Sequence, residues 1–209
     1  RSWLFSCSST LVTDQSSIQT AGVACRKSFS SARTLSNARR CFSAHDAFTD
    51  SGVTVRNRLR FSCEWSRTLA ARVLPVIVPL DVDSTLELVR ALQRGGMRTM
   101  EITLRSAAAL DSIAAVKRAL PGVQVAAGTV TTPDEMSTAL AAGADFCVSP
   151  GLTPALLQRA ADTGVQFLPG VASASEVMLG RSFGLDTFKL FPAVPVGGVA
   201  LLKSLAGPF

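Results

Sequence analysis

The feature that most constrains the fold of this chain is a repeated alternation of short apolar runs and longer helical stretches. Runs rich in β-branched residues begin near Val73, Arg98, Val123, Asp145, Gln166 and Thr187, so neighbouring runs start 21 to 25 residues apart. Helices are predicted between and after them at residues 84–94, 107–119, 133–142, 153–163, 174–183 and 198–206. Strands and helices that alternate at this spacing form βαβ units around a parallel sheet.

Residues at the predicted helix ends agree with these boundaries. Capping side chains or a first-turn proline mark helix starts at Asp83/Ser84, Thr132-Pro133, Thr153-Pro154 and Ser173. Glycines mark helix ends at Gly95-Gly96, Gly143, Gly164 and Gly184.

Two architectures contain such units, the open doubly wound sheet and the closed barrel. No G-x-G-x-x-G follows the first strand, which weakens the nucleotide-binding sheet. Polar residues cluster at the carboxyl ends of successive strands, as they do in barrel enzymes. We therefore predict an α/β fold of the (β/α)8 TIM-barrel class, with about six β/α units in this chain. The first and sixth strands are then expected to be bare sheet edges.

The first third of the chain has a different composition. Residues 1–67 hold 10 Lys and Arg against 4 Asp and Glu, whereas residues 68–209 hold 11 of each. The first segment also has 14 serines and no periodic pattern, which is typical of an organelle transit peptide. A transit peptide would begin with Met, whereas this chain begins with Arg1 and its first methionine is Met97. A fragment and translation from upstream of the true start therefore explain the segment equally well, and a true transit sequence comes behind both. We predict a disordered leader over residues 1–67 and a partial barrel domain over residues 68–209.

Composition also limits the partners. The excess positive charge is scattered through the Ser-rich leader with few aromatics, so we predict no nucleic-acid partner. No apolar stretch reaches the 18 residues that a membrane span needs, so we predict no membrane partner. The absence of a C-x-x-C pair argues against a zinc site, and Cys147, within an apolar run, is expected to be an inert buried thiol. The expected location is the cytoplasm, or an organelle if the leader is a genuine transit peptide.

The second predicted strand places charged residues on one face. Side chains alternate along a strand, so Glu101, Thr103 and Arg105 share one face, and Met100, Ile102 and Leu104 share the other. In a barrel the apolar set packs outward against helices, and the polar set faces the axis. An ion pair between Glu101 and Arg105 and a functional site explain this equally well, because an unpaired buried charge is costly.

The sixth predicted strand carries Lys189 on the face opposite to Phe188 and Leu190. Most lysines are solvated, with only their stems in apolar contact. A lysine pointing inward among apolar residues differs, because desolvation lowers its pKa and makes it an amine nucleophile near neutral pH. The sole histidine, His45, lies in the leader, so residues 68–209 hold neither a Ser-His pair nor a His-ligated metal. An iminium ion on lysine supplies the electron sink that carbon–carbon cleavage then needs, without a cofactor.

Glycine and proline recur at three further strand ends, in Gly128-Thr129, Ser149-Pro150-Gly151 and Pro169-Gly170. Short loops use these residues, and backbone that approaches a ligand also uses them. The sequence does not separate these explanations.

Together, these segments resemble the 2-dehydro-3-deoxy-6-phosphogluconate aldolase and 4-hydroxy-2-oxoglutarate aldolase family over about residues 70–209. The matching segments, in the family's order, are VLPVIV (73–78), EITLR (101–105), AGTV (127–130), SPGLT (149–153), FKLFPA (188–193), Gly197-Gly198 and AGPF (206–209). The resemblance implies a homotrimeric (β/α)8 barrel that cleaves a phosphorylated 2-oxo acid to pyruvate and glyceraldehyde 3-phosphate. Many members also cleave 4-hydroxy-2-oxoglutarate.

The resemblance also implies roles for individual residues. Lys189 forms the Schiff base, and Glu101 is the general acid/base, acting through a water. Arg105 and Thr129 hold the pyruvate carboxylate, and Thr103 and Pro150 line the pocket. No metal or other cofactor is implied.

One part of the family pattern is missing. Family members hold the phosphate with glycine-rich backbone after strand seven and a serine near strand eight, and we expect the chain to be truncated before both. Other interpretations are a galactonate-series or a 4-hydroxy-2-oxoglutarate-specific aldolase, a barrel phosphate isomerase or epimerase, and an inactive truncated fragment.

Overall fold

The computed structural model describes residues 73–209 and, as backbone, residues 2–5. Apart from those four residues, the predicted leader lies outside the described residues. Its disorder, and its transit-like or non-native origin, stay predictions.

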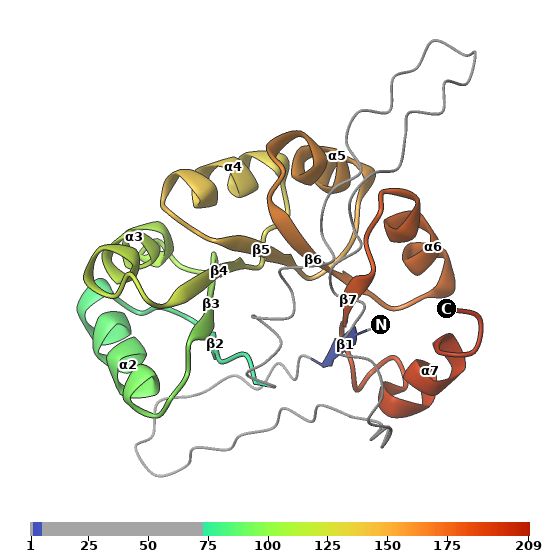
Figure 1. The fold of residues 1–209 in the computed structure, drawn as a ribbon, viewed down its shortest axis with the longest axis horizontal. Helices are drawn as coiled ribbons and strands as arrows, with labels where there is room; N and C mark the ends of the chain where they lie inside the picture. Colours follow the sequence, from blue (N-terminus) through green and yellow to red (C-terminus); the bar gives the residue numbers. More distant parts are fainter. Residues whose placement is uncertain (1, 6–72) are drawn as a thin grey trace, which may run out of the picture. The chain divides into compact units, whose positions relative to one another are not determined.

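Six β/α units follow one another along the described chain (Figure 1). The strands are β2 (Val76–Ile77), β3 (Thr99–Thr103), β4 (Gln124–Gly128), β5 (Phe146–Ser149), β6 (Gln166–Val171) and β7 (Thr187–Leu190). The helices are α2 (Val82–Arg94), α3 (Ala109–Ala119), α4 (Pro133–Ala141), α5 (Pro154–Thr163), α6 (Ala174–Ser182) and α7 (Gly198–Leu205). All six predicted strands and all six predicted helices are present.

The strand order shows which of the two architectures the chain adopts. The six strands are parallel and adjacent in the order of the sequence, β7-β6-β5-β4-β3-β2. A doubly wound sheet reverses its strand order and carries helices on both faces. Here the order never reverses, and Figure 1 shows the helices along one face of the sheet. This is the arrangement of a TIM barrel, as predicted.

A seventh strand was not expected. The backbone of β1 (Ser2–Phe5) pairs in parallel with β7, and Leu4 lies opposite Lys189 in the register. The expectation that β7 is a bare edge is therefore wrong. The leader composition gave no sign of this strand, because a single edge strand needs no long periodic pattern. On the other side of the sheet, β2 has β3 as its strand partner within the described residues.

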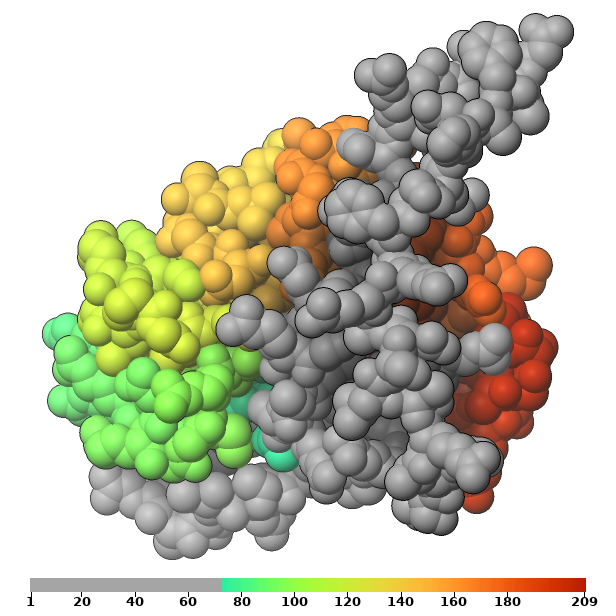
Figure 2. Space-filling model, viewed as in Figure 1, coloured from blue at the N-terminus to red at the C-terminus, as the bar shows by residue number. Residues whose placement is uncertain are grey.

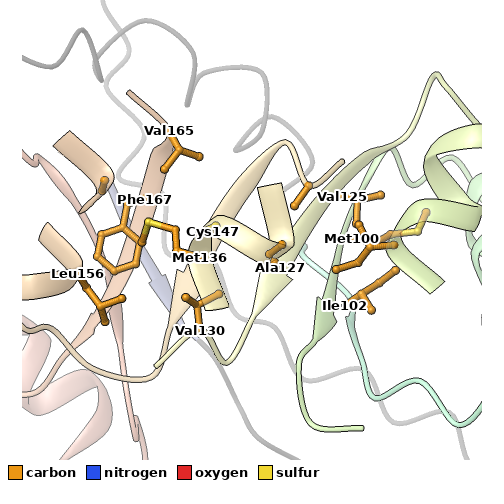
Figure 3. Packing of buried hydrophobic residues seen from close by; sticks show 14 of the residues in the cluster. Met100, Ile102, Val125, Ala127, Val130, Met136, Cys147, Leu156, Val165 and Phe167 are labelled. Carbon is orange, nitrogen blue, oxygen red and sulfur yellow. The ribbon is translucent and has the colours of Figure 1, made fainter. Parts of the chain in front are cut away.

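The alternation of side chains along the strands divides the buried residues into two groups. Residues that face the helices, among them Met100 and Ile102, belong to the large core between sheet and helices. Figure 3 shows part of this core, where Met136 of α4, Leu156 of α5 and Phe167 of β6 lie together. A separate small cluster on the other face of the strands consists of Ala126, Phe146, Val148 and Leu168. The predicted division of β3 into outward apolar and inward polar residues is confirmed.

The helices pack side by side along the sheet. Helix α3 contacts α2 on one side and α4 on the other, and the three form part of the green to yellow surface in Figure 2. Thr132, Thr153 and Ser173 cap their helices as predicted. The first helix differs, because its cap is Asp81, whose carboxylate accepts a hydrogen bond from the Ser84 backbone N–H at 2.8 Å. The Asp83/Ser84 prediction therefore places this helix start about two residues too late.

Candidate active site

An ion pair joins two strands that are far apart in the sheet order. Lys189 Nζ of β7 lies 3.6 Å from Glu101 Oε1 of β3. Four strand spacings separate β3 from β7, which is about 19 Å in a flat sheet. Two side chains are too short to span that distance. The sheet must therefore curl to bring them into contact. The inward direction predicted for both side chains is correct, and the curvature brings their ends together.

Both side chains of this pair are almost completely buried. Only 9% of the Lys189 side chain and 3% of the Glu101 side chain are exposed. The interior cluster of Ala126, Phe146, Val148 and Leu168 comes from the strands that lie between them. Two opposite charges that share a dry interior interact far more strongly than they do in water. The pair is therefore isolated from bulk solvent and electrostatically coupled.

Burial sets the protonation behaviour of Glu101. Loss of water around the carboxyl raises its pKa above the ordinary value of 4.5, and the nearby charge of Lys189 opposes this effect only in part. A carboxyl with a raised pKa holds a proton more readily than a surface glutamate does. Glu101 is therefore better suited than an exposed glutamate to donating a proton as well as accepting one.

The raised pKa of Glu101 predicts a pH dependence of stability. The folded-state pKa lies above the unfolded value, so the folded chain binds the proton more tightly. The resulting stabilisation is complete below pH 4.5 and is lost as the pH rises through the folded pKa. Glu101→Gln removes this titration. We expect the free energy of unfolding of the wild type, minus that of E101Q, to fall as the pH rises between the two pKa values, by at most about 1.4 kcal/mol per pH unit.

Urea unfolding of both proteins from pH 4 to pH 8 measures this difference. The matched control for loss of one carboxylate is Glu87→Gln, at an exposed position. A difference between wild type and E101Q that does not change with pH would contradict the raised pKa.

The two other predicted residues of the second strand have different positions. Thr103, the last residue of β3, is buried, and its hydroxyl donates a hydrogen bond to the Ile77 carbonyl at 3.1 Å. Arg105 lies beyond the strand end, in a bend, and is exposed. Among the described ion pairs, Glu101 is joined to Lys189 and not to Arg105. The alternative of a Glu101–Arg105 pair is therefore not the arrangement that the structure has.

Thr129 and Pro150 follow the carboxyl ends of β4 and β5. Both are half-buried. Thr129 has a φ of 58°, a left-handed conformation that β-branched residues rarely adopt. Such strain persists only where surrounding contacts impose it, and it often marks functional positions. It falls here on a residue that the family resemblance assigns to the site.

One neighbour of Lys189, Phe191, was not predicted as a site residue. Lys189 Nζ lies 5.3 Å from the centre of the Phe191 ring, within the range of a cation–π interaction. In the sequence, Phe191 is only an aromatic residue two positions after the lysine, and a core residue would have the same pattern. The prediction that Cys147 is an inert buried thiol is confirmed. Burial raises the pKa of this thiol to about 12 and leaves it unreactive.

The described part of the chain has neither a metal-binding cluster nor a membrane-spanning helix. No group of three or more His, Cys, Asp or Glu side chains within it is arranged to hold a metal ion. Within the same residues, no helix is both long enough and apolar enough to cross a membrane.

Comparisons with known proteins agree with this geometry. Residues 66–209 match the family model described as "Aldolase: KDPG and KHG aldolase". The "KHG/KDPG aldolase" of Escherichia coli K12 is 43% identical over 137 residues, covering 66% of this chain and 64% of that protein. The "2-dehydro-3-deoxy-phosphogluconate aldolase" of Pseudomonas aeruginosa is 47% identical over 139 residues, covering 66% and 63%. The chain thus spans slightly less than two thirds of the length of these relatives.

Solved structures give the same result. A Zymomonas mobilis 2-keto-3-deoxy-6-phosphogluconate aldolase, solved with 3-phosphoglycerate, has a TM-score of 0.63 at 44% identity, covering 65% of each chain. A Legionella pneumophila KDPG aldolase, with pyruvate captured as a covalent carbinolamine, has a TM-score of 0.64 at 40% identity, covering 65% of this chain and 66% of that one. With its curled β/α sheet and buried lysine–glutamate pair, this chain belongs to the KDPG and KHG aldolase family.

Proposed function

We propose that the protein is a class I aldolase that cleaves 2-dehydro-3-deoxy-6-phosphogluconate to pyruvate and glyceraldehyde 3-phosphate. The observation that carries this proposal is the buried contact of 3.6 Å between Lys189 Nζ and Glu101 Oε1. An amine and a carboxyl, placed together in a buried site, are the two groups that Schiff-base cleavage needs.

Lys189 is the proposed nucleophile. Transfer of its proton to Glu101 leaves a neutral amine, and the raised pKa of Glu101 favours this transfer. The amine attacks the C2 carbonyl of the 2-oxo acid to form a carbinolamine. Glu101 then donates a proton to the departing hydroxyl, and loss of water gives the iminium ion. The positive iminium nitrogen is the electron sink for the next step.

Glu101, ionised once more, is the proposed base in bond cleavage. It accepts the proton of the C4 hydroxyl, acting through a water, as the C3–C4 bond breaks. The bonding electrons move into the enamine on Lys189, and the aldehyde leaves. Protonation of the enamine at C3, followed by hydrolysis of the imine, releases pyruvate and restores the free lysine. The cycle is balanced without an oxidant, a metal or another cofactor.

The other site residues are proposed to hold the substrate. We assign Arg105 and Thr129 to the pyruvate carboxylate, and Thr103 and Pro150 to the walls of the site. The exposed guanidinium of Arg105, beyond the end of β3, supports this assignment because it is free to turn toward an anion. The Thr103 hydroxyl already donates a hydrogen bond to the Ile77 carbonyl. This fixed position suits a residue that lines the site better than one that binds the substrate directly.

Substrate choice, assembly and location follow the family. The Escherichia coli relative is named for both KHG and KDPG, so cleavage of 4-hydroxy-2-oxoglutarate to pyruvate and glyoxylate is a second proposed activity. We propose a homotrimer acting on small-molecule substrates in the cytoplasm. The relatives described above are bacterial, and they give no support to an organelle.

Borohydride reduction in the presence of pyruvate tests the covalent step. We expect reduction to fix a three-carbon adduct on the peptide that contains Lys189, detected by mass spectrometry. The internal control is Lys117, whose Nζ is held by the Asp145 carboxylate at 2.8 Å. An adduct on both peptides would indicate nonspecific reaction, and no adduct on either would refute the proposed class.

A substrate panel assigns the reaction. Cleavage of the phosphorylated six-carbon acid and of 4-hydroxy-2-oxoglutarate is followed by release of pyruvate. An adduct without cleavage of either acid would leave the Schiff base in place and overturn the proposed substrates.

A further inference from the structure

A glycine lies directly against the Glu101 side chain. Gly128 is the last residue of β4, and in the register of the sheet it lies opposite Thr103 of β3. A Cβ atom built on Gly128 would lie 2.6 Å from Glu101 Cγ and 2.7 Å from Glu101 Cδ, and closer still to Glu101 Oε1. Real Cβ atoms essentially never come within 3.0 Å of such neighbours. The Glu101 side chain therefore occupies the space that any other residue at position 128 would need.

We infer that Gly128 is a positioning residue for the proposed aldolase reaction, because its missing side chain lets the Glu101 carboxyl reach Lys189. The inference rests on the proposed function for its catalytic consequence, but its geometric basis is independent. Sequence reasoning attributed the glycine in Gly128-Thr129 either to a turn or to the approach of a ligand. The structure offers a third reason, which is room for a catalytic side chain.

The backbone conformation does not account for this glycine. The φ angle of Gly128 is not positive, so alanine is compatible with its backbone conformation. Gly170, on β6 opposite Lys189, provides a contrast. A Cβ atom on Gly170 would meet the Pro150 backbone carbonyl, which is fixed by the chain. At position 128 the obstacle is a side chain, which is able to rotate away, so G128A should move Glu101 rather than disrupt the fold.

A double-mutant cycle tests this inference. Glu101→Ala removes all three atoms that an alanine at position 128 would meet. We expect G128A to lower kcat for cleavage by roughly 10²-fold, as expected when a general acid–base is displaced. In the E101A background, G128A should change kcat by less than about threefold, because the group it displaces is already gone. Gly122→Ala is the matched control, since open space surrounds that glycine, and it should leave kcat unchanged.

The outcomes separate positioning from a merely structural role. Equal losses from G128A in both backgrounds would overturn the inference, because they would show an effect that does not pass through Glu101. If G128A does not fold, comparison of G128A with E101A/G128A still tests the inference. The double variant must fold if the clash with Glu101 is what prevents G128A from folding. Failure of both proteins to fold, with E101A folded, would also overturn it.

A measurement without substrate separates this inference from the proposed function. In the wild type, Lys189→Met should raise the pKa of Glu101, followed by carboxyl ¹³C NMR, because the charge that lowers it is lost. In G128A the same replacement should have little effect, since Glu101 no longer reaches Lys189. An equal response in both backgrounds would sink the inference. An inactive wild type that shows the expected pattern would refute the aldolase proposal alone.

Discussion

Replacement of Lys189 by methionine should abolish aldol cleavage and the borohydride adduct with pyruvate. Methionine keeps an apolar chain of similar length in the buried site but has no amine, so no Schiff base forms. Loss of a covalent nucleophile lowers kcat by about 10⁴-fold or more in other enzymes. Pyruvate release, coupled to a dehydrogenase, measures the loss, and circular dichroism checks the fold.

Two further lysine variants serve as controls for K189M. Lys189→Arg keeps the positive charge beside Glu101 and should be as inactive as K189M, because the guanidinium does not become a nucleophile. Lys117→Met breaks the ion pair with Asp145, outside the proposed site, and should retain wild-type activity. Appreciable cleavage by K189R would show that Lys189 acts through its charge rather than as a covalent nucleophile, and would refute the Schiff-base mechanism.

Replacement of Glu101 by glutamine should lower kcat by about 10²- to 10⁴-fold, the usual contribution of a general acid–base. Glutamine nearly preserves the shape of the buried side chain but transfers no proton. The amine of Lys189 remains, so borohydride should still trap pyruvate on it, but more slowly. Rapid-quench trapping and steady-state cleavage, measured on one preparation, separate these two effects.

The matched variant is Glu87→Gln on the exposed surface of α2, which should leave both rates unchanged. If E101Q trapped pyruvate and cleaved the substrate at wild-type rates, Glu101 would be only a structural partner of Lys189. Loss of the adduct together with intact folding would instead assign Glu101 an essential part in carbinolamine formation.

Local pattern was sufficient for the order of strands and helices and for the direction of each strand side chain. Strand alternation is a property of the backbone, so Glu101 and Lys189 were placed on the inner face without knowledge of their neighbours. Local pattern was insufficient to place residues beyond the strand ends. Arg105 follows the same alternation, but β3 stops at Thr103, and Arg105 lies in an exposed bend.

Contacts between distant strands were decided only by the tertiary structure. Glu101 and Lys189 are 88 positions apart in the sequence, and the curl of the sheet selects Lys189 rather than Arg105 as the partner of Glu101. The space above Gly128 and the pairing of β1 with β7 likewise depend on which strands lie together. The repeating β/α pattern by itself therefore determined the class of fold and the inward direction of the Glu101 and Lys189 side chains. The curvature that packing imposes on the sheet decided that they meet, because residue spacing does not encode how far a sheet bends.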